Sequence, residues 1–241
     1  MTEEFSRGKQ QLKVATMGHA GHGKTALTAA INHVLSMKGR AKKEGNFPGI
    51  DVHHSAYESD KRVYEHIDAP TDLIPHTITS AAQFDGAIVV VSAADGPMPQ
   101  TLEHIQHARQ VGVHRIVAFL NKCDLVDDKD LLDLIEMEVR ELLSHNGFSG
   151  DDVPVIHGSA LKALAARSAD DPWARKVMDL VASLDEHVSS SETRAPSVPR
   201  GARVSQSVNT SHGAQAPQAT RSPGAVPSFT DRLRDLFGRK R

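Results

Sequence analysis

The chain has 241 residues, a net charge of −2, 39% hydrophobic residues and one cysteine. This length fits one ordinary domain with additional segments. No apolar run approaches the roughly 18 residues of a membrane span, and the polar residues 1–11 lack the pattern of a signal peptide. A single cysteine excludes an internal disulfide, and we expect a reducing, cytoplasmic setting.

The charge is unevenly distributed along the chain. From residue 189 onward, nine Arg and Lys stand against three Asp and Glu, a net charge of +6, so the total of −2 leaves −8 for residues 1–188. An acidic body argues against broad contact with a nucleic-acid backbone. Attraction to polyanions is therefore expected only of the basic tail.

The first part of the chain predicts a strand, a helix, a loop and then a two-stranded hairpin. Residues 12–17 predict a strand, and a helical pattern begins near Lys24. The basic, glycine-containing residues 40–48 predict a loop. Residues 52–58 and 62–68 predict the two arms of the hairpin.

The second half continues the alternation of strands and helices. In chain order the predictions are a strand at 86–92, a helix at 99–110, a strand at 115–121, a helix at 129–145, a strand at 153–157 and a helix at 173–188. Such alternation predicts an α/β fold, a mainly parallel sheet with helices on both faces. Ligands of these sheets bind beyond the carboxyl ends of the strands.

Residues 12–188 therefore form the predicted domain, preceded by an extension at residues 1–11. Ser, Pro, Ala, Gln and Gly dominate residues 189–228, which predicts a disordered linker. Residues 229–241 are basic and carry Phe229, Leu233, Leu236 and Phe237 at helical spacing. Two interpretations of this end stay open: a helix that docks on a partner or on an anionic membrane surface, and a solvated, frayed terminus.

A glycine-rich segment directly follows the first predicted strand. Its sequence G-H-A-G-H-G-K-T matches G-x-x-x-x-G-K-[ST], whose backbone N–H groups surround phosphate oxygens at a helix N-terminus. Lys24 is predicted to place its charge between the β- and γ-phosphates, and Thr25 to bind Mg²⁺. The predicted nucleotide contacts of this segment are Gly18, His19, Ala20, Gly21, His22, Gly23, Lys24, Thr25 and Ala26.

Asn121-Lys122-Cys123-Asp124 follows a buried strand and predicts recognition of guanine. The carboxylate of Asp124 accepts from both N1–H and the 2-amino group of guanine, whereas adenine offers neither donor. A site with such an acceptor discriminates by roughly 10⁴-fold. Asn121 is predicted to tie the loop together and to touch the base edge, and the stem of Lys122 to lie over the ring.

Two further stretches complete the predicted site. Ser159-Ala160 is predicted to present a backbone N–H to guanine O6, where the amino group of adenine would clash, and Leu161 is a further predicted nucleotide contact. Asp68 ends a predicted strand and is expected to hold Mg²⁺ through water; the alternative is a solvated strand-end carboxylate. The expected cofactors are thus GTP or GDP with Mg²⁺.

Taken together, these residues resemble the guanine-nucleotide domain of bacterial elongation factor Tu, over about residues 11–188. The similar blocks include residues 27–31, 81–88, 95–101, 119–128, 136–143 and 158–164. The resemblance implies a P-loop NTPase fold, a three-layer sandwich around a mainly parallel six-stranded sheet, and a GTPase of the translation-factor type. It also implies a diverged, truncated paralogue. The family continues into two β-barrels that bind aminoacyl-tRNA, and we do not expect tRNA binding here.

The departures from the family concern hydrolysis. The family motif D-C-P-G-H is replaced by Asp68-Ala69-Pro70-Thr71-Asp72. Thr71 restricts the backbone where the family has glycine. Asp72 replaces the histidine that positions water in the family. Its carboxylate adds repulsion near the phosphates, and its reference pKa of ~3.9 makes it a poor base at neutral pH. We therefore expect slow GTP hydrolysis, with Thr71 and Asp72 as altered catalytic positions.

Other departures and alternatives remain. In the first switch, Asp51 is the predicted replacement for the threonine that the family uses to bind Mg²⁺, and in the phosphate loop Gly21 and Ala26 replace an aspartate and a threonine. The 14 histidines lack zinc-site spacings, and a metal role for pairs such as His53-His54 is the weaker interpretation. A second functional hypothesis is a non-catalytic, nucleotide-gated module that recruits a partner through residues 229–241.

Overall fold

The computed structural model describes residues 8–46, 53–68 and 84–188. Its strands are β1 (Gln10–Met17), β2 (Ala41–Asn46), β3 (His53–Glu58), β4 (Arg62–Asp68), β5 (Gly86–Ser92), β6 (Ile116–Asn121) and β7 (Val155–His157). Its helices are α1 (Lys24–Ser36), α3 (Pro99–Gln110), the 3₁₀ turn η1 (Cys123–Leu125), α4 (Lys129–His145), α5 (Ala160–Ala165) and α6 (Pro172–His187).

The strands form one sheet in the order β2-β3-β4-β1-β5-β6-β7. Strands β4, β1, β5, β6 and β7 are parallel to one another, while β3 is antiparallel to both β2 and β4. The predicted α/β class, with a mainly parallel sheet, is confirmed. The described sheet has seven strands, one more than the resemblance implied.

The additional strand corrects the prediction of a loop at residues 40–48. Strand β2 pairs with β3, with a register shift between Ala41 and Lys43. Its sequence, AKKEGN, has little intrinsic preference for strand. The edge of β3 offers unpaired N–H and C=O groups, and this tertiary pairing outweighs the local preference. Sequence periodicity carries no signal for such an edge strand.

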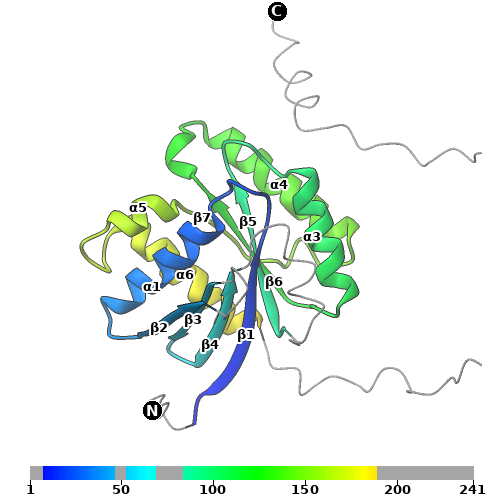
Figure 1. The fold of residues 1–241 in the computed structure, drawn as a ribbon. Helices are drawn as coiled ribbons and strands as arrows, with labels where there is room; N and C mark the ends of the chain where they lie inside the picture. The colour runs from blue at the N-terminus through cyan, green and yellow to red at the C-terminus, as the bar shows by residue number, and fades with distance from the viewer. Residues whose placement is uncertain (1–7, 47–52, 69–83, 189–241) are drawn as a thin grey trace, which may run out of the picture. The chain divides into compact units, whose positions relative to one another are not determined.

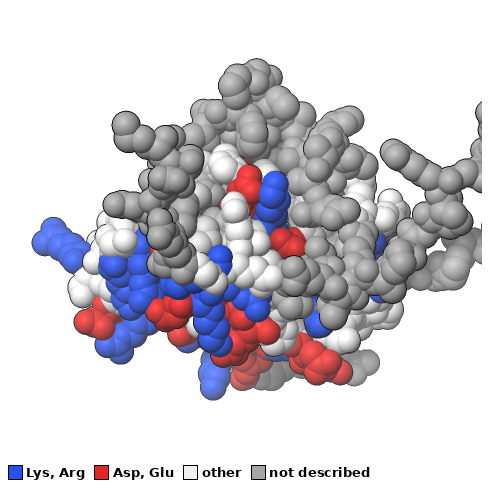
Figure 2. All heavy atoms as spheres, turned by 90° about the horizontal axis from the view of Figure 1, so that it is seen from below, with Lys and Arg blue, Asp and Glu red and all other residues white. Residues whose placement is uncertain are grey.

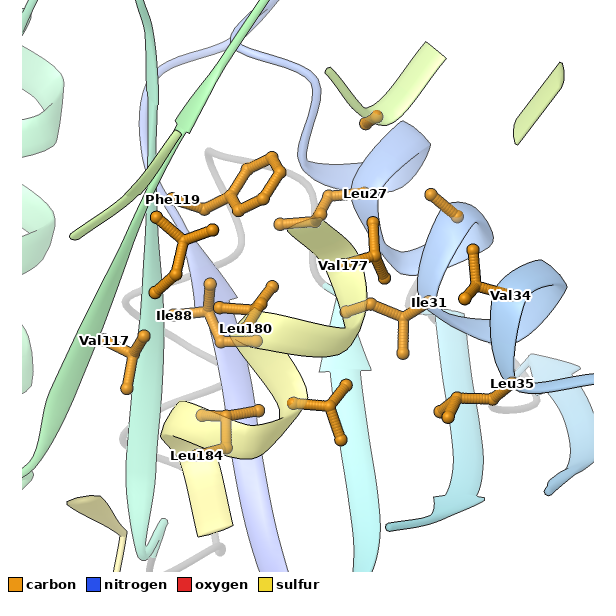
Figure 3. Packing of buried hydrophobic residues seen from close by; sticks show 14 of the residues in the cluster. Leu27, Ile31, Val34, Leu35, Ile88, Val117, Phe119, Val177, Leu180 and Leu184 are labelled. Atoms are coloured by element: carbon orange, nitrogen blue, oxygen red, sulfur yellow. The ribbon is translucent and has the colours of Figure 1, made fainter. Parts of the chain in front are cut away.

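Helices cover both faces of the sheet (Figure 1): α1, α5 and α6 lie on one face, α3 and α4 on the other. The core beneath α1 contains fully buried apolar side chains from α1, α6 and two strands of the sheet (Figure 3). Helix α1 contributes Leu27, Ile31, Val34 and Leu35, the sheet Ile88, Val117 and Phe119, and α6 Val177, Leu180 and Leu184. This packing fixes the start of α1, and with it the loop after β1, against the sheet.

The helices after β6 begin with side-chain caps. The carboxylate of Asp128 accepts from the N–H groups of Asp130 and Leu131 at the start of α4, and that of Asp171 accepts from Trp173 and Ala174 at the start of α6. These caps account for the sharp helix starts that the sequence predicts.

Charged side chains of both signs share the face of the domain seen in Figure 2, where Lys and Arg lie beside Asp and Glu. Ion pairs include Lys9–Glu58, at 2.5 Å, and Arg40–Asp60, at 2.6 Å. No single sign of charge dominates the described residues in this view. Among the residues that the structure describes, no helix is long and apolar enough to cross a bilayer.

Candidate nucleotide-binding site

The phosphate loop joins β1 to α1 and depends on three glycines. Gly18, Gly21 and Gly23 have φ angles of 139°, 79° and 90°, in the region that side chains rarely adopt. A Cβ at Gly18 would collide with the carbonyl oxygen of Val90, and one at Gly23 with the side chain of Asn121. Glycine at positions 18 and 23 therefore lets the loop lie directly against β5 and the end of β6.

Lys24, the first residue of α1, turns its ammonium back into this loop. Its Nζ donates to the carbonyl oxygens of Gly18, at 3.1 Å, and His19, at 3.2 Å. Burial lowers the pKa of Lys24, and the nearby carboxylate of Asp68 partly opposes that effect. The ammonium and the carboxylate therefore lie close together on the loop side of the sheet, as a phosphate- and metal-binding site requires.

Asn121 joins the phosphate loop to the loop after β7. Its Nδ2 donates to the carbonyl oxygen of His22 at 2.8 Å, and its Oδ1 accepts from the N–H of Ala160 at 2.9 Å. The side chain is 3% exposed. Three predicted motifs, distant in sequence, thus meet at one amide.

His22 lies at the centre of the phosphate loop and is 1% exposed. Its ring contacts that of His19 edge-on, with centroids 5.1 Å apart. Burial lowers the pKa of His22 to about 4, and the carbonyl group of Val90 partly offsets this. The His22 ring is therefore neutral near pH 7 and adds no positive charge to the loop.

Asp68 and Thr25 are the predicted metal ligands that the structure describes. Asp68 ends β4, is 2% exposed, and pairs with Thr16 of β1, two residues before the phosphate loop. Thr25, the second residue of α1, is exposed. A carboxylate and a hydroxyl are the hard oxygen donors that Mg²⁺ prefers, and the acidic group already interacts with Lys24. The donor set therefore fits Mg²⁺.

The predicted guanine-contacting residues lie at the carboxyl ends of β6 and β7. Lys122 has a φ of 60°, and its Nζ lies 3.4 Å from Oδ2 of Asp95. Asp124 is half-buried in η1. Leu161, at the start of α5, is 70% exposed. Lys122 and Asp124 thus follow β6, while Leu161 follows the neighbouring strand, β7.

Two backbone N–H groups in the loop after β7 already have acceptors within the domain. The N–H of Ala160 already donates to Asn121, and that of Lys162 donates to Oγ of Ser159 at 3.2 Å. Leu161 lies between them, where first-turn N–H groups have no acceptor within the helix. The hydrogen bonds of Ala160 and Lys162 thus occupy the N–H groups on either side of Leu161.

Helix α3 supplies contacts that sequence reasoning missed. The N–H of Gly18 donates to Nδ1 of His104 at 3.3 Å, and that of Ala20 donates to Oε1 of Gln100 at 3.2 Å. Gln100 and His104 are one turn apart on α3. The sequence places Gln100 and His104 on one face of the predicted helix. It does not indicate which loop that face contacts. The side chain of Ala26, also in the predicted set, is partly buried and packs against the core.

Some predicted positions lie outside the described residues. These are Asp51, Thr71, Asp72 and the segments 189–228 and 229–241. Within the described ranges, no group of three or more His, Cys, Asp or Glu side chains is arranged to hold a metal ion. Cys123 is buried and donates to the carbonyl oxygen of Leu120 at 3.1 Å; burial raises the pKa of its thiol to about 11.

The domain has the features of a P-loop nucleotide-binding domain. These are the order of its strands, a loop that depends on glycine, and a buried lysine at the start of α1. A comparison with protein families agrees: the family model "Elongation factor Tu GTP binding domain" matches residues 9–190. This match covers most of the chain, and the chain belongs to that family. The domain is therefore a GTP-binding domain of the translational-GTPase type.

Proposed function

We propose that the domain binds GDP and GTP together with Mg²⁺ and that it hydrolyses GTP slowly. The observation that carries the proposal is the position of Asn121, which joins the phosphate loop to the loop after β7 through two short hydrogen bonds. A nucleotide whose phosphates lie in the first loop would place its base against the second. Guanine nucleotides have this form and match the donors and acceptors at both ends.

The phosphate end of the ligand would be held by the loop and Lys24. Backbone N–H groups of residues 21–25 would surround the phosphate oxygens, since those of Gly18 and Ala20 already donate to His104 and Gln100. Lys24 would exchange its bonds to the Gly18 and His19 carbonyl groups for bonds to the β- and γ-phosphates. Thr25 and Asp68 would hold Mg²⁺, Asp68 through water. The bound ion would neutralise phosphate charge.

The base end of the ligand would be recognised from two sides. Asp124 would accept from N1–H and the 2-amino group, and the N–H of Leu161 would donate to O6. The stem of Lys122, with its ammonium held near Asp95, would cover one side of the ring. The exposed side chain of Leu161 would offer an apolar surface to the other side.

Slow hydrolysis follows from Thr71 and Asp72, on sequence grounds alone. A carboxylate at position 72 opposes the negative charge of the transition state and does not position water as a neutral histidine does. In single-turnover assays, Asp72→His should accelerate GTP hydrolysis, whereas Asp72→Asn, which removes only the charge, should give a smaller gain. A wild-type rate as fast as that of Asp72→His would refute the assignment.

A non-catalytic role is the second candidate, favoured by the replacement of both Thr71 and Asp72 next to a retained phosphate loop. In that case the nucleotide would gate binding to a partner through residues 229–241. The test compares partner capture by GDP-bound and GTP-bound protein, with and without those residues. Equal capture in all four samples would exclude nucleotide-gated recruitment.

A further inference from the structure

Glu136, on α4, joins two basic side chains behind the loop that follows β7. Its Oε1 accepts from Nε and Nη2 of Arg140, at 2.9 and 2.8 Å, and its Oε2 accepts from Nε2 of His157 at 2.7 Å. The three side chains are 26 to 28% exposed. Burial raises the pKa of Glu136, but the hydrogen bonds from Arg140 and His157 outweigh it and hold that pKa below its usual value.

Arg140 also fixes the segment that leads into β7. Its Nη1 donates to three carbonyl oxygens, those of Gly150 at 2.8 Å, Asp151 at 3.1 Å and Val153 at 2.9 Å. A guanidinium with this many acceptors is rigid, because each bond restricts the same planar group. The carboxylate of Glu136 is therefore held in place, and it holds His157 in turn.

His157 is placed where a small displacement would reach both loops that contact the base. It ends β7 and pairs with Leu120, the residue before Asn121. The next residue, Gly158, donates to the carbonyl oxygen of Leu120 at 2.9 Å and accepts from the N–H of Cys123 at 3.1 Å. A Cβ at Gly158 would collide with the ring of Phe119. The backbone after His157 thus has little free space.

We propose that Glu136, Arg140 and His157 are positioning residues that set the distance between the loop at residues 159–161 and the O6 edge of the bound guanine. The proposal rests on the proposed function. None of the three side chains need touch the nucleotide. Glu136 holds His157, His157 holds the end of β7, and α5 begins three residues later, at Ala160.

The test measures the affinity of the full-length chain for GDP and for inosine diphosphate (IDP) by calorimetry. Hypoxanthine, the base of IDP, keeps O6 and N1–H but lacks the 2-amino group. The ratio of the GDP and IDP affinities therefore reports on the contact with Asp124. A parallel change in both affinities reports on the O6 contact, which the two bases share. The variants are His157→Leu, which removes the donor to Glu136, Glu136→Gln, which weakens the acceptor, and His157→Gln, which retains an N–H donor.

A matched control is available in His187→Leu. Nε2 of His187 lies 2.9 Å from the carbonyl oxygen of Asp152, in the segment that Arg140 also contacts, but the histidine lies on α6 and does not contact β7 through this bond. The control therefore loosens the same segment without releasing His157. Thermal melting of every variant reports any general loss of stability.

We expect His157→Leu and Glu136→Gln to lower the affinities for GDP and for IDP in parallel, by about tenfold or about 1.4 kcal/mol. His157→Gln should retain most of the wild-type affinity for both nucleotides. His187→Leu should change neither affinity. Wild-type-like affinities in His157→Leu and Glu136→Gln would overturn the proposal while leaving the proposed function intact. A change in the ratio of GDP to IDP affinity without a common loss would also overturn the proposal. An equal loss of affinity in His187→Leu would do the same. Wild-type protein that binds neither nucleotide would overturn both.

Discussion

Asn121 is the side chain on which the site most depends, and Asn121→Ala removes both of its bonds. The two bonds, of 2.8 and 2.9 Å, are made by a residue that is 3% exposed. Each such bond contributes about 1 kcal/mol net, and leaving a buried partner unsatisfied costs about 1–3 kcal/mol. The carbonyl group of His22 and the N–H of Ala160 both lose their partner. We expect the free energy of unfolding to fall by about 3 kcal/mol.

Urea unfolding of the nucleotide-free protein measures this loss. With a typical slope of about 2–3 kcal/mol per molar urea, the midpoint should fall by about 1 M. The matched control is Asn146→Ala, since Nδ2 of Asn146 makes one bond, of 2.7 Å, to Leu142 at the end of α4 and joins no loops. That variant should lose about 1 kcal/mol. Equal losses in the two variants would refute the argument that Asn121 joins three motifs.

Two further predictions concern the phosphate loop and the buried histidines. Gly18→Ala should abolish GDP binding in calorimetry, because the added Cβ collides with Val90. In Gly21→Ala the added Cβ meets nothing within 4 Å, so this variant should still bind GDP and lose only about 1 kcal/mol of stability for its positive φ. Equal loss of GDP binding in the two variants would contradict the clash at Gly18. Burial lowers the pKa of His22 from 6.5 to about 4 and that of His66 from 6.5 to about 3. The unfolded chain therefore binds more protons below pH 6.5, and stability that is present above that pH is lost as the pH falls. The loss should reach about 2 kcal/mol per histidine at pH 5, and His22→Leu should flatten the dependence measured by urea unfolding; an unchanged slope would contradict the burial effect.

The sequence predicted the central strands and the long helices well. The apolar run of β5 and the periodic patterns of α3 and α4 begin and end at the predicted residues, because local periodicity and helix-start signals carry this information. Strand β2 was missed because its pairing with β3 is a tertiary effect. Local patterns do not encode which edge a polar segment meets.

The candidate site was predicted in composition but not in its internal contacts. Asn121 was predicted to tie its own loop together, and the structure adds that its two partners lie in two other loops. The use of the Ala160 N–H by Asn121, and the contact of His104 with Gly18, depend on how α3 and α5 pack against the sheet. A single sequence gives the motifs, whereas the packing decides which donors stay available to a ligand.

The most direct test of the account is a calorimetric titration of the full chain with GDP, GTP, ADP and ATP in the presence of Mg²⁺. The account predicts that both guanine nucleotides bind, and that both adenine nucleotides bind at least about 10⁴-fold more weakly, because adenine leaves the carboxylate of Asp124 without its two donors. ATP or ADP bound as tightly as GDP, or no nucleotide bound at all, would contradict it.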